Sequence, residues 1–242
     1  MMKRISAILM FAVLSGCATV GTEHVEKLKP GTSIVALSLM GDTLAIRHVG
    51  TTVFQNERLD ATVADWQIDK YAESVASRLI SSGNRFQAKA VETNEARASA
   101  GKIVMDFWTS KAVLQGGTGS VTKLAREAGA DYVLVLGPAQ LGDPFFGTNQ
   151  AFSGYGIYQR SAFGSRRAIN YLTMRVVLLD GKNGTEVART HGVSSAPRGE
   201  AIWMDSDNLT LSGDNAQKTR SGIQALMETV LQKALTDLML VP

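Results

Sequence analysis

Cysteine is nearly absent from this 242-residue chain: Cys17 is the only one, so no disulfide can form within one molecule. Proline is also scarce, with 5 residues, and histidine is limited to 3. The N-terminal apolar run, residues 5–14, is shorter than the roughly 20 residues that a membrane-spanning helix needs. With 45% hydrophobic and 19% charged residues, the composition is that of a globular protein and excludes global disorder, a collagen-like rod and a coiled coil.

Clusters of one charge sign are also rare. The chain has 25 Lys and Arg against 22 Asp and Glu, for a formal net charge of +3. Only Arg160, Arg166 and Arg167 lie close together in the sequence. A nucleic-acid-binding face needs clustered cations, so we expect no nucleic acid partner.

The sequence contains no recognisable catalytic motif. No G-x-S-x-G nucleophile turn is present, and His24, His48 and His191 lie far apart without a metal-ligand pattern. We therefore expect no catalytic residue, no metal site and no cofactor. The alternative is a hydrolase with a site built from Asp, Glu and His, which would require His48 or His191 to meet a carboxylate and a hydroxyl in a cleft.

What the sequence does contain begins at its N-terminus. Residues 1–4 are basic, residues 5–14 are apolar, and Leu14-Ser15-Gly16-Cys17 follows at once. This pattern resembles the bacterial lipoprotein signal. The resemblance implies cleavage before Cys17, a diacylglyceryl group on its sulfur and an acylated amine.

The lipoprotein signal also predicts a location and a first division of the chain. Ala18 follows the lipidated residue where, in such proteins, Asp favours retention in the inner membrane, so we expect the outer membrane, facing the periplasm. Residues 1–16 are then a signal peptide. Residues 17–32 are expected to be a tether, and its polar part, residues 19–31, reaches up to ~40 Å when extended.

The remainder, residues 33–242, predicts one α/β (α+β) domain with a mixed sheet. Apolar patterns predict strands, the last two forming a hairpin, at 33–40, 43–48, 85–91, 131–137, 169–180 and 185–195. Helical spacing predicts helices at 65–82, 94–100, 120–128 and 216–240, the last of them an amphipathic C-terminal helix. We expect residues 43–48 to pair back on 33–40, and Gly116–Gly119 to be a flexible loop.

The segment 142–167 is unusual because aromatic side chains alternate there with glycine, and arginines close it. Tyr, Phe and Arg often anchor protein interfaces. We therefore name a candidate partner-binding set: Phe152, Tyr155, Tyr158, Arg160 and Phe163. Two alternatives stay open, a hairpin whose aromatics cover one end of its own core and insertion into a membrane.

Beyond the signal, the chain is similar to bacterial envelope lipoproteins with an anticodon-binding-like α/β domain, such as the curli-secretion channel lipoprotein. The segment Ala128–Leu134 and the turn Asp180–Thr185 carry this resemblance. It implies a non-enzymatic binding or scaffolding component of the cell envelope, with a protein partner or self-association. A subunit of an envelope secretion or assembly complex is the alternative.

Overall fold

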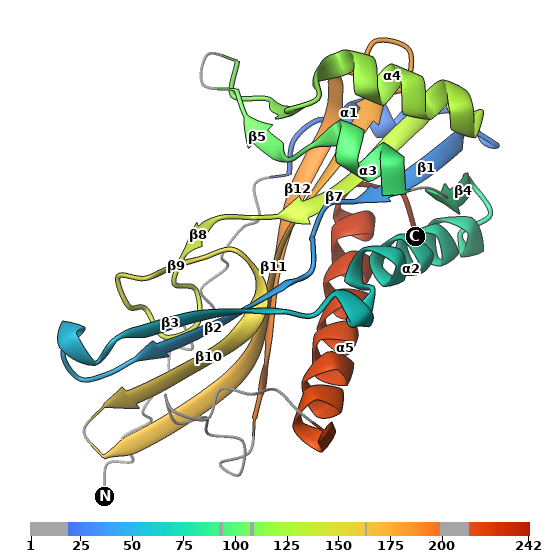
Figure 1. The fold of residues 1–242 in the computed structure, drawn as a ribbon. Coiled ribbons are helices and arrows are strands. Elements are labelled where there is room, and N and C mark those ends of the chain that lie inside the picture. The colour runs from blue at the N-terminus through green and yellow to red at the C-terminus, as the bar shows by residue number, and fades with distance from the viewer. Residues whose placement is uncertain (1–18, 92–93, 107–108, 163, 199–212) are drawn as a thin grey trace, which may run out of the picture.

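The computed structural model describes residues 19–91, 94–106, 109–162, 164–198 and 213–242. The helices are α1 (Thr22–Glu26), η1 (Val53–Gln55), η2 (Ala64–Trp66), α2 (Ile68–Ser82), α3 (Asn94–Ala100), α4 (Gly117–Ala128) and α5 (Gly213–Asp237). The strands are β1 (Ser33–Ser38), β2 (Thr43–Val49), β3 (Glu57–Thr62), β4 (Gln87–Ala90), β5 (Ile103–Met105), β6 (Ala112–Leu114), β7 (Tyr132–Pro138), β8 (Leu141–Gly142), β9 (Ala151–Phe152), β10 (Gly154–Ala162), β11 (Ser165–Asp180) and β12 (Glu186–Pro197). The expected single mixed α/β fold with a C-terminal helix is confirmed (Figure 1).

The main sheet is organised around β11, a strand of 16 residues. Along one edge of β11, β10 pairs with its first part, up to Thr173, and β7 pairs with the rest, from Met174 onward. The opposite edge of β11 pairs with β12 in the hairpin that the sequence predicts. The sheet therefore has two wings, β10-β2-β3 and β7-β1-β4, joined by one continuous strand.

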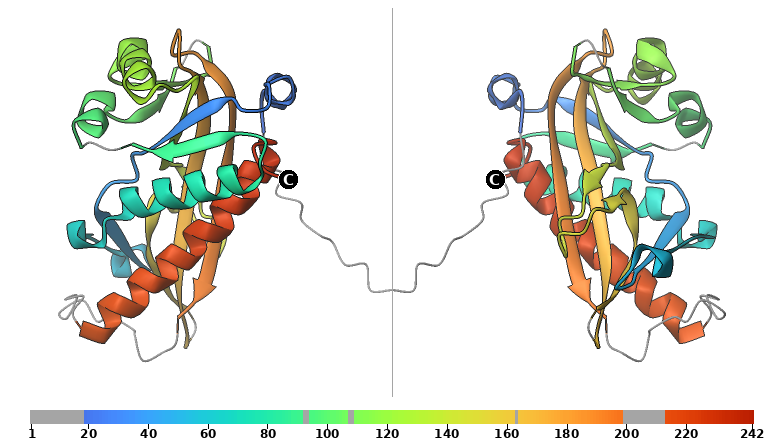
Figure 2. Two further views of the ribbon diagram at one scale, coloured as in Figure 1. Left: turned by 90° about the vertical axis from the view of Figure 1, so that its right-hand side faces the viewer. Right: turned by 90° about the vertical axis from the view of Figure 1, so that its left-hand side faces the viewer.

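Helices cover the two faces of this sheet unequally. One face carries α2 and α5, whose apolar sides meet residues such as Leu134 and Leu172 (Figure 2). The other face carries α3 and α4 over the β7-β1-β4 wing, around Val133 and Val177. On that same face none of the described helices lies over the β10-β2-β3 wing, and a separate cluster around Tyr171 covers it instead.

The expected pairing of β1 with β2 is wrong. β1 pairs with β4 and β7, whereas β2 runs parallel to β10 in the other wing and antiparallel to β3. The chain crosses between the wings at Leu39–Gly41, where the backbone N–H groups of Met40 and Gly41 donate to Asp69. A side chain from α2 fixes this crossing, and nothing in the local sequence pattern reveals it. The expected loop at Gly116–Gly119 is also wrong from Gly117 onward, where α4 begins.

The structure corrects the expected tether from Val20 onward. The N–H groups of Val20 and Arg189 each donate to the other's carbonyl at 3.0 Å, and the Thr19 and Thr190 hydroxyls lie 3.1 Å apart. Val25, in α1, is completely buried. One buried side chain in a single helical turn produces no periodic pattern, so this docking could not be predicted from the sequence. The boundaries of the signal peptide and the domain stay predictions.

Gly21 is required for this docking, which predicts a local defect in Gly21→Ala. A Cβ at position 21 would lie 2.1 Å from the Val187 carbonyl oxygen, and the residue has φ +83°. The clash adds to the roughly 1–2 kcal/mol that a left-handed backbone costs other residues. Hydrogen exchange at the Val20 amide should accelerate by about tenfold or more, with little change in global stability.

Gly31→Ala is the matched control. Gly31 has φ +82°, but a Cβ there would meet nothing within 4 Å. If Gly31→Ala exposes the Val20 amide equally, the close approach of Gly21 to β12 is not what holds the segment.

Candidate functional site

The aromatic segment chosen from the sequence lies largely inside the molecule. Phe152, Tyr155 and Tyr158 are each at most 1% exposed. Phe163 lies outside the described residues. Arg160 is half-buried, and its guanidinium donates to the Phe146 carbonyl at 3.0 Å.

Phe152 and Tyr158 cover the face of the β10-β2-β3 wing on which the described residues place no helix, whereas Tyr155 points to the opposite face and packs in the core beneath α2 and α5. The ring of Phe152 lies 4.4 Å from that of Tyr158 and 5.1 Å from that of Tyr171, between centroids. The Tyr158 hydroxyl donates to Asp143 at 2.8 Å, and burial raises the pKa of this phenol. The arrangement matches the alternative in which the aromatics cover one end of their own core. A partner role for this segment stays a prediction.

An exposed apolar turn lies at the same end of the sheet. Val53 and Phe54, in η1 between β2 and β3, are 66% and 96% exposed. The side-chain oxygen of Gln55 accepts the backbone N–H groups of Thr51 and Thr52. β2 ends at Val49, which is opposite Arg160 in β10. The turn is therefore held in shape while it presents two apolar side chains to solvent.

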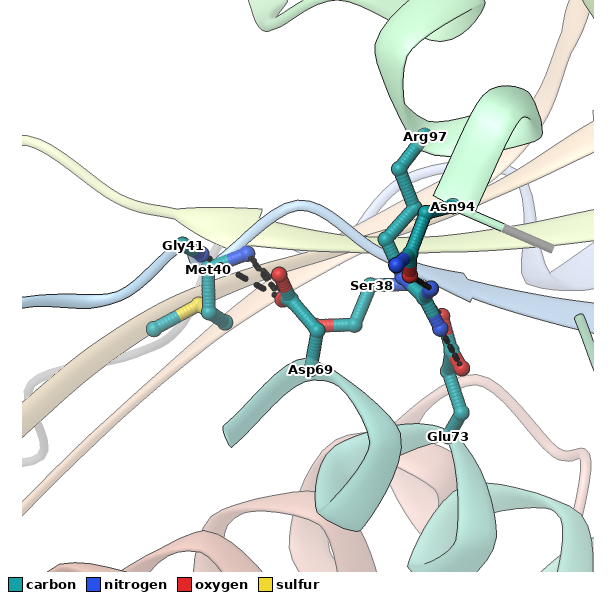
Figure 3. A network of polar contacts seen from close by, with 7 residues as sticks. All are labelled: Ser38, Met40, Gly41, Asp69, Glu73, Asn94 and Arg97. Atoms are coloured by element: carbon teal, nitrogen blue, oxygen red, sulfur yellow. Dashed lines mark hydrogen bonds and ion pairs between the residues drawn. The ribbon is translucent and has the colours of Figure 1, made fainter. Parts of the chain in front are cut away.

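A buried ion pair joins α2 to α3 near the carboxyl end of β1 (Figure 3). Glu73 is 1% exposed, and both of its oxygens accept from the Arg97 guanidinium. The Ser38 N–H also donates to Glu73, at 2.8 Å. Next to this pair, Asp69 accepts the Ser38 hydroxyl at 2.6 Å. The group connects three elements and borders a cleft of about 330 Å³ that Arg97 and Asp69 help to line.

Burial dominates the electrostatics of Glu73. It raises the pKa of this carboxyl from 4.5 to about 7, against the lowering effect of Ser38 and Arg97. Ser38 is completely buried, so no substrate reaches its hydroxyl. The arrangement holds α2, α3 and β1 in position relative to one another. The sequence analysis missed it, although a carboxylate at position 73 sits within the apolar side of the helix, three residues before Ala76.

A second polar group brings together residues that a hydrolase would use. The His48 Nε2 atom lies 3.0 Å from the Ser161 hydroxyl, and its Nδ1 atom lies 3.8 Å from a Glu57 carboxylate oxygen. The three residues come from β2, β10 and β3. The hydroxyl contact meets the geometric condition for a base and a nucleophile, but the carboxylate is beyond hydrogen-bond distance. None of the described clefts is lined by this triad.

The other candidate groups have less structural support as functional sites. His191 lies opposite Arg175 in the β11–β12 ladder, and burial lowers its pKa, as does the neighbouring cation. Among the described residues no three His, Cys, Asp or Glu side chains gather as a metal site would require. In the same part of the chain no helix is long and apolar enough to cross a membrane. Cys17 lies outside the described residues.

Comparison with known proteins gives distant likenesses only. No family model and no curated protein matches the chain. The PelC dodecamer from Paraburkholderia phytofirmans is 13% identical, over 87% of this chain and 89% of that one, with a TM-score of 0.39. Lipoprotein GNA1162 from Neisseria meningitidis is 16% identical, over 73% and 88%, with a TM-score of 0.31. The LpoB C-terminal domain from Escherichia coli is 13% identical, over 73% and 96%, with a TM-score of 0.29. These scores are low, so the proposals below rest on this chain's own residues.

Proposed function

We propose that this chain is a lipoprotein of the outer membrane, attached through Cys17 and facing the periplasm, which acts as a non-enzymatic binding or scaffolding component of the cell envelope. The observation that carries the proposal is the sequence Leu14-Ser15-Gly16-Cys17 after a basic and then an apolar segment. Three acyl chains on one residue bind a membrane far more strongly than the single chain that gives only reversible binding.

Cys17→Ala tests the attachment. The variant is expected to lose acylation and to leave the membrane fraction, because no other cysteine can receive the lipid. Mass spectrometry of the N-terminal peptide and fractionation of cells measure both effects. A matched Ala18→Ser variant should keep both. An unmodified wild-type N-terminus would contradict the proposal.

We further propose that the apolar turn of η1 contacts the protein partner. Phe54 is almost fully exposed, and water-exposed rings of this kind commonly mark interaction sites. Arg58 and Arg167 are exposed at the same end, and Arg160, opposite Arg167 on the neighbouring strand, is half-buried. An apolar projection beside cations fits a partner that offers an apolar pocket bordered by carboxylates. Among the described residues of the candidate set, Arg160 is the one that is not fully buried.

Phe54→Ala is expected to remove partner crosslinks in cells and to leave the melting temperature nearly unchanged, because Phe54 is 96% exposed and buries very little area within the chain. In-cell crosslinking and thermal unfolding measure the two effects. Met239→Ala is the matched control, since Met239 is exposed at 40% elsewhere. Crosslinks that survive Phe54→Ala would place the contact on another surface.

A hydrolase is the second candidate function, because His48 meets the Ser161 hydroxyl at 3.0 Å. If Ser161 is a nucleophile, a fluorophosphonate probe should label the wild type and not Ser161→Ala. Ser195→Ala, at an exposed serine of β12, is the control. Absence of labelling in the wild type would support the non-enzymatic proposal.

A further inference from the structure

The first described residues are fixed to the outer edge of β12. Val20 exchanges two backbone hydrogen bonds with Arg189, both 3.0 Å long. Just beyond it, the Arg85 guanidinium donates to the carbonyls of Val25 and Glu26 at 3.0 and 2.7 Å. Followed toward the N-terminus, the chain therefore stays bound to the domain surface as far as Val20.

Only two residues, Ala18 and Thr19, separate Cys17 from this fixed point. Each residue spans at most ~3.6 Å, so the Cα atom of Cys17 lies within about 11 Å of that of Val20. A lipid attached at Cys17 has its glycerol at the level of the headgroups. The two-residue linker is consequently too short to hold the domain away from the bilayer.

We propose that the bilayer surface lies against one defined patch of the domain, which we call the anchor patch: Val20, Met105, Lys111 and Val113. The proposal rests on lipidation of Cys17, which is the proposed function. Arg189 connects the two parts of the patch, since its backbone bonds Val20 and its guanidinium donates to the Ser110 carbonyl at 2.6 Å.

The side chains of the anchor patch suit the boundary between water and lipid headgroups. Val20, Met105 and Val113 are 44%, 39% and 36% exposed, and they are three of only seven large apolar side chains that are this exposed in the described residues. Lys111 is exposed beside them and can reach a lipid phosphate, while its methylene stem covers apolar surface.

Fluorescent labels on single introduced cysteines test this orientation. Acylation consumes the thiol of Cys17, so Lys111→Cys is the only reactive site in its variant. The comparison is Thr51→Cys, exposed in the turn between β2 and β3 and separated from β12 by β11, β10 and β2. Each lipidated protein is reconstituted into phosphatidylethanolamine–phosphatidylglycerol vesicles that carry a quencher on the headgroup. Quenching at position 111 is expected to exceed quenching at position 51 several-fold.

A third variant tests the short attachment as the cause. A flexible insert of about 12 Gly and Ser residues between Ala18 and Thr19 has a root-mean-square reach of ~20 Å. It should keep vesicle binding and reduce quenching at position 111 toward that at position 51. Equal quenching at the two positions without the insert, or an unchanged contrast with it, would overturn the inference. Failure of the parent protein to acquire lipid and float with vesicles would instead overturn the proposed function, and the two failures are read from separate measurements.

Discussion

Arg97→Ala is expected to lower the free energy of unfolding by about 3–5 kcal/mol near pH 8, which is the usual cost of leaving a buried charge without its partner. Glu73 is 1% exposed, so without Arg97 its carboxylate accepts a hydrogen bond from the Ser38 N–H alone among the described residues, and the loss of the cation that lowers its pKa makes the charged form still more costly near pH 8. Near pH 5 the cost should fall to about 1 kcal/mol, because the carboxyl takes up a proton and only hydrogen bonds are lost.

The wild type should show the same group in its own pH dependence. The pKa of Glu73 is about 7 in the folded chain and 4.5 in the absence of the fold. Between these values the folded chain holds more protons than the unfolded chain, so this group's contribution to stability is present below about pH 4.5 and is lost as the pH rises through 7.

Chemical denaturation at the two pH values measures both effects. The control is the double variant Glu73→Gln, Arg97→Ala, which removes the titrating group and should give a pH-independent cost. If Arg97→Ala is as harmful near pH 5 as near pH 8, ionisation of Glu73 is not the cause and the guanidinium acts through packing alone.

Gly156→Ala is expected to be at least as harmful, with a loss of about 4 kcal/mol, above the usual 1–3 kcal/mol for overpacking. A Cβ at position 156 would lie 1.9 Å from the Ala45 carbonyl oxygen and 2.9 Å from the ring of Tyr171. The Ala45 carbonyl belongs to the backbone of the paired strand β2. The clash can therefore be removed only if β2 and β10 move apart.

Thermal unfolding measures this loss, which corresponds to a fall of about 8–16 °C in the melting temperature for a chain of this size. Gly119→Ala is the control, because a Cβ in that helical position would meet nothing within 4 Å. It should be neutral or raise stability slightly, since alanine favours helix. A small effect of Gly156→Ala would mean that the two strands are not as closely apposed as described.

Elements with strong local patterns were predictable from the sequence. The turn at Asp180–Thr185 and the apolar runs on either side predict the β11–β12 hairpin, which the structure confirms. The helix expected at 120–128 is present as α4, which ends at Gly129 in the left-handed conformation. Such features depend on a few neighbouring residues, and the physical rule that links them to structure is local.

Features that depend on distant contacts were not predictable in this way. Strand pairing in the β1–β2 region follows from Asp69, a residue about 30 positions from the crossing that it fixes. Tyr158 lies in a Gly-rich segment that suggests surface, yet it is buried because the face of the β10-β2-β3 wing away from α2 and α5 is covered by aromatic rings. The Ser161–His48 contact joins positions 113 apart in the sequence, and no spacing rule reports that they are on adjacent strands.

The continuous strand β11 sets the distance between the docked N-terminal segment and the exposed turn. Val177, opposite Arg189, marks the level of the N-terminal docking, and Arg167, opposite Arg160, marks the level of the exposed turn. Ten residues of extended chain between them span ~33 Å. A sheet hydrogen-bonded on both sides of this strand resists bending, so a pull at the turn is transmitted to the docked N-terminus as a displacement of the whole body. Lengthening the ladder by two residues would move the turn by ~7 Å without changing which side chains face the core.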